Sequence, residues 1–214
     1  MTSQYERELR HVLAGIPAGV EAVIRSCSVE EKEKMRLVLK RPFLVVRAAG
    51  SGIEGSGDLL ALRGDISFPI EVKTTKGTKI YLSGRTLDQY NALAYEGERC
   101  GLMPLYAHRL KGTRGDSWRI FRVETSTLEG RLRVLARRIP ALPRTRKGRA
   151  FIDWEQGMPL NEFIHVVCQH NEHSPTLEYI QKRSVVDEEA SVESKSTHRT
   201  SILDELQRRR TIIR

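Results

Sequence analysis

The sequence has no long apolar run, few cysteines and no excess of acidic residues. No apolar stretch approaches the roughly 20 residues that a membrane helix needs, so we expect no membrane span. The polar residues 1–4 are unlike a secretory signal, which predicts a cytoplasmic location. Three cysteines are too few and too scattered for a disulfide framework, and no CxxC pair suggests a zinc ribbon.

Positive charge is what the chain has in excess. It carries 36 Lys and Arg against 27 Asp and Glu, a net charge of +9, with a pI near 9.7. Such an excess favours a polyanionic partner, most commonly nucleic acid, and so a nucleoid-associated protein. The plainer alternative is a basic, well solvated surface. A chain of 214 residues with 39% apolar residues can bury one core, so we expect one domain with extensions.

Hydrophobic periodicity indicates an α/β protein. The patterns predict helices over residues 4–14, 20–26, 28–39 and 86–97, and strands over residues 43–47, 58–62, 68–74, 80–82, 102–109 and 118–123. A capping box from Ser28 to Glu31 supports the third helix. The order of helix, strands, helix and strands predicts a mixed central β-sheet flanked by helices.

The chain changes character after residue 127. No carboxylate separates Arg131 from Arg149 in an arginine-rich stretch, and Pro140 and Pro143 predict that it is extended. This stretch is either a DNA-contacting arm or a solvated linker. We divide the chain into a core (1–127), a basic extension that docks on or beside the core (128–173) and a polar, flexible tail (174–214).

Chemistry is indicated by a predicted hairpin that carries Asp58 on one strand and Glu71 and Lys73 on the next. Because side chains alternate along a strand, Glu71 and Lys73 share one face, and the hairpin can bring Asp58 beside Glu71. Two adjacent carboxylates favour a hard cation between them, and magnesium suits such oxygen ligands. A bound metal and a nearby lysine would support phosphodiester hydrolysis. The alternative is an ordinary cross-strand ion cluster.

These residues also resemble a known family, the archaeal Holliday-junction resolvases of the PD-(D/E)xK nuclease superfamily. The matching segments, in the family's order, are YEREL (5–9), VVRAAGS (45–51), DLLA (58–61) and IEVKT (70–74), followed by a helix. The resemblance implies that Asp58 and Glu71 are metal ligands and that Lys73 is the catalytic lysine. It also implies a metal-site role for Glu6 on the first helix, and positions near the scissile strand for Arg47 and Ser51.

The resemblance further implies a restriction-endonuclease-like fold with a five-stranded sheet. It implies a homodimer that nicks two opposed strands of branched DNA with Mg²⁺, for which Mn²⁺ would substitute. This chain departs from the family in a longer connection over residues 15–40 and in the unmatched region after residue 127. Helix geometry places Glu6 and Glu8 at opposite borders of the apolar face, so either could reach the metal site.

Other candidates are weaker. Lys76, Lys79 and Arg85 could grip phosphates, and Gln89 is a further candidate contact. A group of His165, Cys168, His170 and His173 resembles zinc ligands but lacks a second pair, so a helix end with exposed histidines is favoured. The tail could bind a protein partner, although no clamp-binding peptide is present. Two other functions stay open: another PD-(D/E)xK nuclease of restriction, flap or repair type, and a non-catalytic DNA-binding module.

Overall fold

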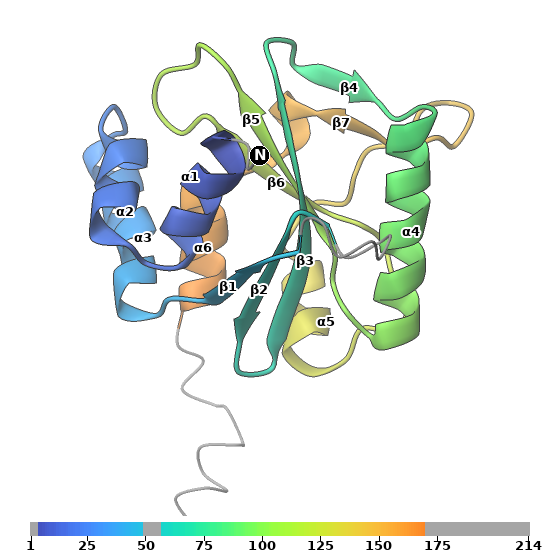
Figure 1. The fold of residues 1–214 in the computed structure, drawn as a ribbon, viewed down its shortest axis with the longest axis horizontal. Helices are drawn as coiled ribbons and strands as arrows, with labels where there is room; N and C mark the ends of the chain where they lie inside the picture. Colours follow the sequence, from blue (N-terminus) through green and yellow to red (C-terminus); the bar gives the residue numbers. More distant parts are fainter. Residues whose placement is uncertain (1–3, 49–56, 170–214) are drawn as a thin grey trace, which may run out of the picture. The chain divides into compact units, whose positions relative to one another are not determined.

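The computed structural model describes residues 4–48 and 57–169. Within them a mixed six-stranded sheet runs in the order β1-β2-β3-β5-β6-β8, with helices on both of its faces (Figure 1). The strands of this sheet are β1 (Leu44–Arg47), β2 (Leu59–Arg63), β3 (Ile66–Thr75), β5 (Leu105–Leu110), β6 (Trp118–Arg122) and β8 (Met158–Pro159). The predicted α/β class with a mixed central sheet is confirmed.

The remaining elements are helices and a short second sheet. The helices are α1 (Gln4–Leu13), α2 (Pro17–Ile24), α3 (Val29–Lys40), α4 (Arg85–Cys100), α5 (Gly130–Ala136) and α6 (Leu160–Cys168), with a 3-10 turn η1 (Trp154–Gln156). Strands β4 (Lys79–Tyr81) and β7 (Phe151–Asp153) pair antiparallel beside the main sheet. Of the described helices, none is long and apolar enough to span a membrane.

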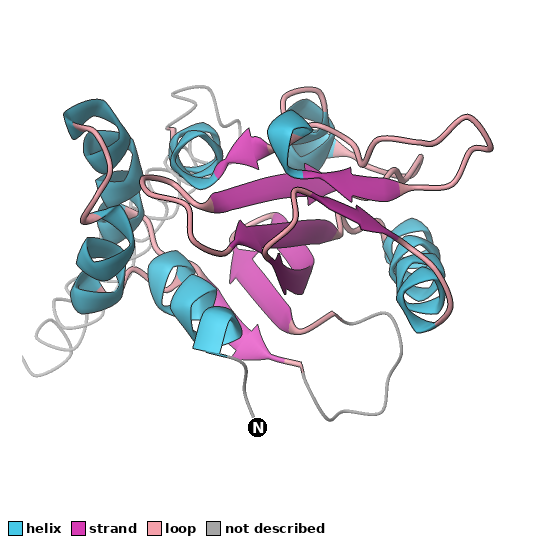
Figure 2. Cartoon of the chain, turned by 90° about the horizontal axis from the view of Figure 1, so that it is seen from above, coloured by secondary structure: helices cyan, strands magenta, loops and turns pink. Residues whose placement is uncertain are grey.

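Strand β3 is the centre of the architecture. It forms the predicted hairpin with β2, closed by a tight turn at Gly64 and Asp65, and pairs in parallel with β5 on its other side. A parallel pair needs a crossover connection, which α4 supplies. Figures 1 and 2 show α4 on one side of the sheet and α1, α2, α3 and α6 on the other.

The side-chain alternation of the strands separates two apolar clusters. Ile70 of β3 and Leu105 of β5 belong to the larger cluster, which they share with α1, α3, α5 and α6. Tyr106 of β5 and Phe121 of β6 point the opposite way, into a smaller cluster with Leu93 of α4. Each face of the sheet is therefore covered, as expected where parallel strands lie inside.

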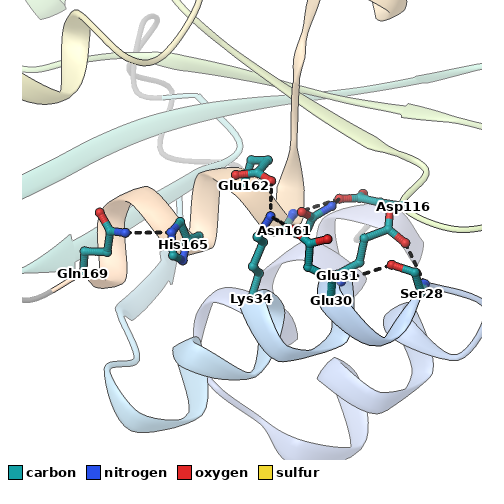
Figure 3. A network of polar contacts seen from close by, with 9 residues as sticks. All are labelled: Ser28, Glu30, Glu31, Lys34, Asp116, Asn161, Glu162, His165 and Gln169. Atoms are coloured by element: carbon teal, nitrogen blue, oxygen red, sulfur yellow. Dashed lines mark hydrogen bonds and ion pairs between the residues drawn. The ribbon is translucent and has the colours of Figure 1, made fainter.

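Polar contacts fix the helical layer. Ser28 and Glu31 form the predicted capping box at the start of α3, with the Ser28 side chain accepting a hydrogen bond from Glu31 N. Lys34 of the same helix binds Glu162 of α6 at 2.7 Å (Figure 3). Three arginines, Arg41, Arg63 and Arg131, donate to carbonyl groups at the end of α6, where a helix dipole favours positive charge.

Two expectations about the second half of the chain are wrong. The main sheet has six strands rather than five, because residues 158–159 add β8 beside β6. The arginine-rich stretch is not extended from its start, since residues 130–136 form α5, which buries Leu132 and Leu135 in the larger cluster. Helices α5 and α6 thus pack into the same cluster as the hairpin, whereas Leu142, Ala150 and Ile152 belong to the smaller cluster. The predicted tail (174–214) and the loop over residues 49–56 lie outside the described residues.

Candidate active site

The position of Asp58 depends on a close approach between two backbone segments. Gly57 has φ +71°, and a Cβ at this position would lie 2.7 Å from the carbonyl oxygen of Ile70. Only glycine adopts this conformation so close to a neighbouring strand. Asp58 then donates its N–H to Ile70 O at 2.8 Å, and its Oδ2 accepts the N–H of Val72 at 2.8 Å. The Asp58 carboxylate is thereby held against the segment that carries Glu71.

Glu71 and Lys73 project together from the α4 face of β3, as the alternation predicts. Lys73 Nζ donates to Glu71 Oε1 at 2.7 Å and to Gln89 Oε1 of α4 at 2.9 Å. Glu71 is 5% exposed, and Lys73 and Gln89 are partly buried. Gln89, considered from the sequence as a phosphate contact, therefore orients the lysine between a strand and a helix.

The electrostatics of Glu71 indicate two carboxylates in close proximity. Burial raises the pKa of Glu71, the charge of Asp58 raises it further, and the ammonium of Lys73 opposes both. A carboxylate that is desolvated beside a second carboxylate is costly to keep ionised, and a divalent cation removes that cost. The oxygen-only donor pair of Asp58 and Glu71 fits a magnesium ion, which is commonly held by one or two carboxylates with water and substrate phosphate.

The structure distinguishes the two residues of α1, Glu6 and Glu8, that are candidates for a third acidic residue at the metal site. Glu8 Oε1 accepts hydrogen bonds from Arg109 Nε and Trp118 Nε1, both at 2.8 Å, and so stabilises the fold. Glu6 is partly buried, and its charge contributes to the raised pKa of Glu71. Within residues 4–48 and 57–169, no three acidic, histidine or cysteine side chains are assembled as a metal site. Glu6 therefore stays a predicted ligand that is near Glu71 without completing a cluster.

The predicted DNA-contacting residues lie at several places. Arg47 is exposed at the end of β1, where it is in register with Leu59, next to Asp58. Lys76 and Arg85 are exposed, the first in the loop after β3 and the second at the start of α4. Lys79 is half exposed and forms an ion pair with Asp153 at 3.3 Å. Ser51 lies outside the described residues.

The histidine and cysteine group is only partly described. His165 Nε2 lies 2.6 Å from the Gln169 side-chain nitrogen, and the Cys168 thiol is buried 3.3 Å from Arg63 Nη1. These two side chains contact different partners, and His170 and His173 lie outside the described residues. Among the described residues, no three histidine, cysteine or acidic side chains are arranged to hold a metal ion. The zinc site therefore stays a hypothesis.

Two residues beside the site were missed from the sequence. Tyr106 and His108 of β5 are in register with Glu71 and Lys73, and both are fully buried. The Tyr106 hydroxyl and His108 Nδ1 have no hydrogen-bond partner among the described residues, while His108 Nε2 lies 2.9 Å from Thr75 Oγ1. The available signal was a tyrosine and a histidine alternating within an apolar strand.

Burial of His108 predicts a loss of stability in acid. It lowers the pKa of His108 to about 4, against about 6.5 in an unfolded chain. Between these values the unfolded state binds more protons, so the free energy of unfolding falls as pH drops through this window. We expect a loss of about 2 kcal/mol between about pH 7 and pH 5 from this residue, measured by urea unfolding. His108→Gln should remove that part of the dependence, whereas His11→Gln should retain it.

The mixed sheet and the hairpin that carries Asp58, Glu71 and Lys73 form the arrangement predicted for a nuclease of the PD-(D/E)xK class. The family model described as "Archaeal holliday junction resolvase (hjc)" matches residues 22–171. The match covers more than half of the chain, so this chain belongs to the archaeal Holliday junction resolvase family. The family is one of DNA-binding nucleases of recombination, and the predicted endonuclease class is confirmed.

A solved structure of Hjc, a Holliday junction resolvase from the archaeal hyperthermophile Archaeoglobus fulgidus, is similar at 24% sequence identity and a TM-score of 0.39. The similarity covers 63% of this chain and 96% of that one. A search of curated proteins gave no match. The family match begins at residue 22, so it includes Asp58, Glu71 and Lys73 but not Glu6.

Proposed function

We propose that this chain is a magnesium-dependent, structure-selective endonuclease that resolves four-way DNA junctions by paired phosphodiester hydrolysis. The observation that carries the proposal is the site on β2 and β3, where Asp58 is fixed beside buried Glu71 and Lys73 is held between Glu71 and Gln89. Family membership supplies the substrate class.

The residues of the site have distinct roles in this proposal. Asp58 and Glu71 would hold Mg²⁺, or Mn²⁺ in its place, and Glu6 would add negative charge nearby. A metal held there would supply an activated water and would neutralise charge that grows on the scissile phosphate. Lys73 keeps its ammonium beside the carboxylates through its bond to Gln89, from where it can donate to a phosphate oxygen. Because β3 fixes both Asp58 and Glu71, the metal and the scissile phosphate would be held in one orientation relative to each other.

DNA would be held mainly through its phosphates. Arg47 lies next to Asp58 along the sheet, and exposed Lys76 and Arg85 flank the far end of β3 and the start of α4. Contacts of this kind position a duplex without reading its bases. We therefore expect weak sequence preference and an affinity that falls steeply with salt.

A homodimer forms part of the proposal. Resolving a junction without leaving a lesion needs two symmetric cuts, which a twofold axis delivers. Strand β1 is at the edge of the sheet, and its Leu44 and Val46 side chains are 66% and 47% exposed. An apolar edge strand is a surface that a second copy of the chain can cover. A chain that sediments as a monomer while it cuts both strands would remove the dimer from the proposal.

A cleavage panel tests the proposed function. Labelled four-way junction and linear duplex of the same sequence are incubated with the full chain in magnesium, in manganese and with a chelator. We expect paired nicks in the junction, at least about tenfold faster than any cut in the duplex, and no cleavage with the chelator. Equal rates on the two substrates would favour another nuclease of the same fold, and cleavage that survives the chelator would exclude the metal.

A further inference from the structure

The arginines over residues 131–144 divide into two groups. Arg131 donates to Val167 O at 3.0 Å, Arg138 donates to Gln169 Oε1 at 3.2 Å, and Arg144 forms an ion pair with Glu124 at 2.9 Å. These three stabilise the fold. The guanidinium groups of Arg133 and Arg137, by contrast, have no hydrogen bond or ion pair among the described residues, and both are exposed.

Arg133 and Arg137 line one side of a pocket of about 550 Å³. They stand one helical turn apart at the end of α5, so they share one side of it, while Leu132 and Leu135 are buried on the other. Arg122 of β6 completes the cationic lining, and its Nε donates to Ile139 O at 3.1 Å.

The remaining lining is mixed, because Leu128 and Ala136 are apolar and the hydroxyl groups of Thr125, Ser126 and Thr127 donate to Leu102 and Glu98 of α4 and the loop after it. Glu129 is the one carboxylate among the lining residues, and the Glu98 carboxylate is bound to Ser126 beside them. Three guanidinium groups around one carboxylate leave a concave surface of net positive charge. Planar guanidinium groups match phosphate oxygens in geometry as well as in charge.

The Arg122 side of this pocket and the candidate active site lie on opposite faces of the sheet, while the Ser126 and Thr127 side of the pocket contacts the end of α4. Arg122 is in register with Leu105, on the face of the sheet that packs into the larger cluster with α5. Glu71 and Lys73 project from the face that α4 covers. A straight duplex bound over Asp58 and Glu71 follows one face, whereas branched DNA has further arms that can turn toward the other.

We infer that the Arg122, Arg133 and Arg137 pocket binds backbone phosphates of a second arm of branched DNA. The inference rests on the proposed function and adds to it a physical source of preference for junctions over linear duplex. The pocket contributes affinity for the additional arm and takes no part in the hydrolysis, because none of its residues belongs to the Asp58 and Glu71 site.

Binding measurements on the full chain test the inference. The double variant Arg133→Ala, Arg137→Ala is compared with wild type and with Arg25→Ala, Lys40→Ala, which removes two exposed cations from the α2 and α3 region. Dissociation constants for a four-way junction and for a linear duplex of the same sequence are measured over a series of salt concentrations, with a chelator to prevent cleavage.

We expect the pocket variant to bind the junction about tenfold more weakly, with a salt slope smaller by about 2, because two phosphate contacts are lost. Its affinity for duplex should change by less than about threefold, and the control variant should alter the two affinities equally. At saturating junction in magnesium, the pocket variant should cut at the wild-type rate.

Two results would overturn the inference. Equal losses on junction and duplex would show that the pocket does not bind a second arm, and unchanged affinity for both would show that it does not bind DNA. Failure of the proposed function has a different signature. It would appear in the wild-type chain, as absence of junction cleavage in magnesium, whatever the pocket variant does.

Discussion

Asp58→Asn is expected to slow junction cleavage strongly while leaving the fold intact. The amide keeps a side-chain oxygen that can accept the Val72 N–H, so the hairpin contact at 2.8 Å is retained. The negative charge beside Glu71 is lost, and with it one ligand of the proposed metal. Metal stabilisation of transition-state charge amounts to several kcal/mol, so we expect junction cleavage to slow by about a thousandfold. Single-turnover cleavage in saturating magnesium measures this rate.

The matched control is Asp65→Asn at the other end of the same hairpin. Asp65 is exposed in the tight turn between β2 and β3, and its substitution removes the same charge far from Glu71. This variant should cleave within about twofold of wild type, since surface substitutions away from special features have small effects. Junction binding in the absence of magnesium should persist in both variants. Cleavage by Asp58→Asn at the rate of the control would refute the assignment of Asp58 to the site.

The sequence was informative about the site because side chains alternate between the two faces of a strand. Glu71 and Lys73 must share a face when Ile70 and Val72 enter the core, and the structure places them so. The turn residues at positions 64 and 65 then set the register of the hairpin, which pairs Leu59 with Ile70 and lets the N–H of Asp58 donate to Ile70 O. These relations are local, and local geometry needs no knowledge of the rest of the fold.

Contacts between distant segments could not be predicted in the same way. Helix geometry left Glu6 and Glu8 equivalent, and the choice depends on Arg109 and Trp118, about a hundred residues further along the chain. Those partners reach Glu8 only after β5 and β6 have paired. The roles of arginines after residue 130 were equally hidden. Neither charge nor spacing reveals that Arg131 contacts the end of α6 whereas Arg133 lines a pocket.

Short elements were missed for an energetic reason. Strand β8 has two residues, too few for a side-chain period to be recognised. It forms because the packing of α6, which follows it, holds it beside β6. In α5, Leu132 and Leu135 are separated by Arg133 and Val134, and the prolines that suggested an extended chain lie after the helix has ended. Both elements are stabilised by burial against the core rather than by local propensity.

Asp116→Ala is expected to be the most destabilising substitution of a polar residue outside the site. Asp116 is 6% exposed, its Oδ1 accepts the N–H of Trp118, and its Oδ2 accepts both the N–H and the side-chain amide of Asn161. Figure 3 shows Asp116 and Asn161 in contact between β6 and α6. Alanine leaves three buried donors without an acceptor, and each unsatisfied group costs about 1–3 kcal/mol. We expect the free energy of unfolding to fall by about 3 kcal/mol or more, measured by urea denaturation.

Two further variants separate this hydrogen-bonding role from a general effect of charge. Asp116→Asn keeps one side-chain oxygen and should lose less stability than the alanine variant, because one of the two acceptors remains. Glu33→Ala removes an exposed carboxylate from α3 and should change stability by less than about 0.5 kcal/mol. Since Asp116 connects β6 to α6, and α6 covers the face of the sheet opposite Glu71, the alanine variant should still cleave junctions at temperatures where it is folded. Equal stability of the alanine variant and wild type would mean that Trp118 and Asn161 find other acceptors, and that the contact between β6 and α6 does not depend on this carboxylate.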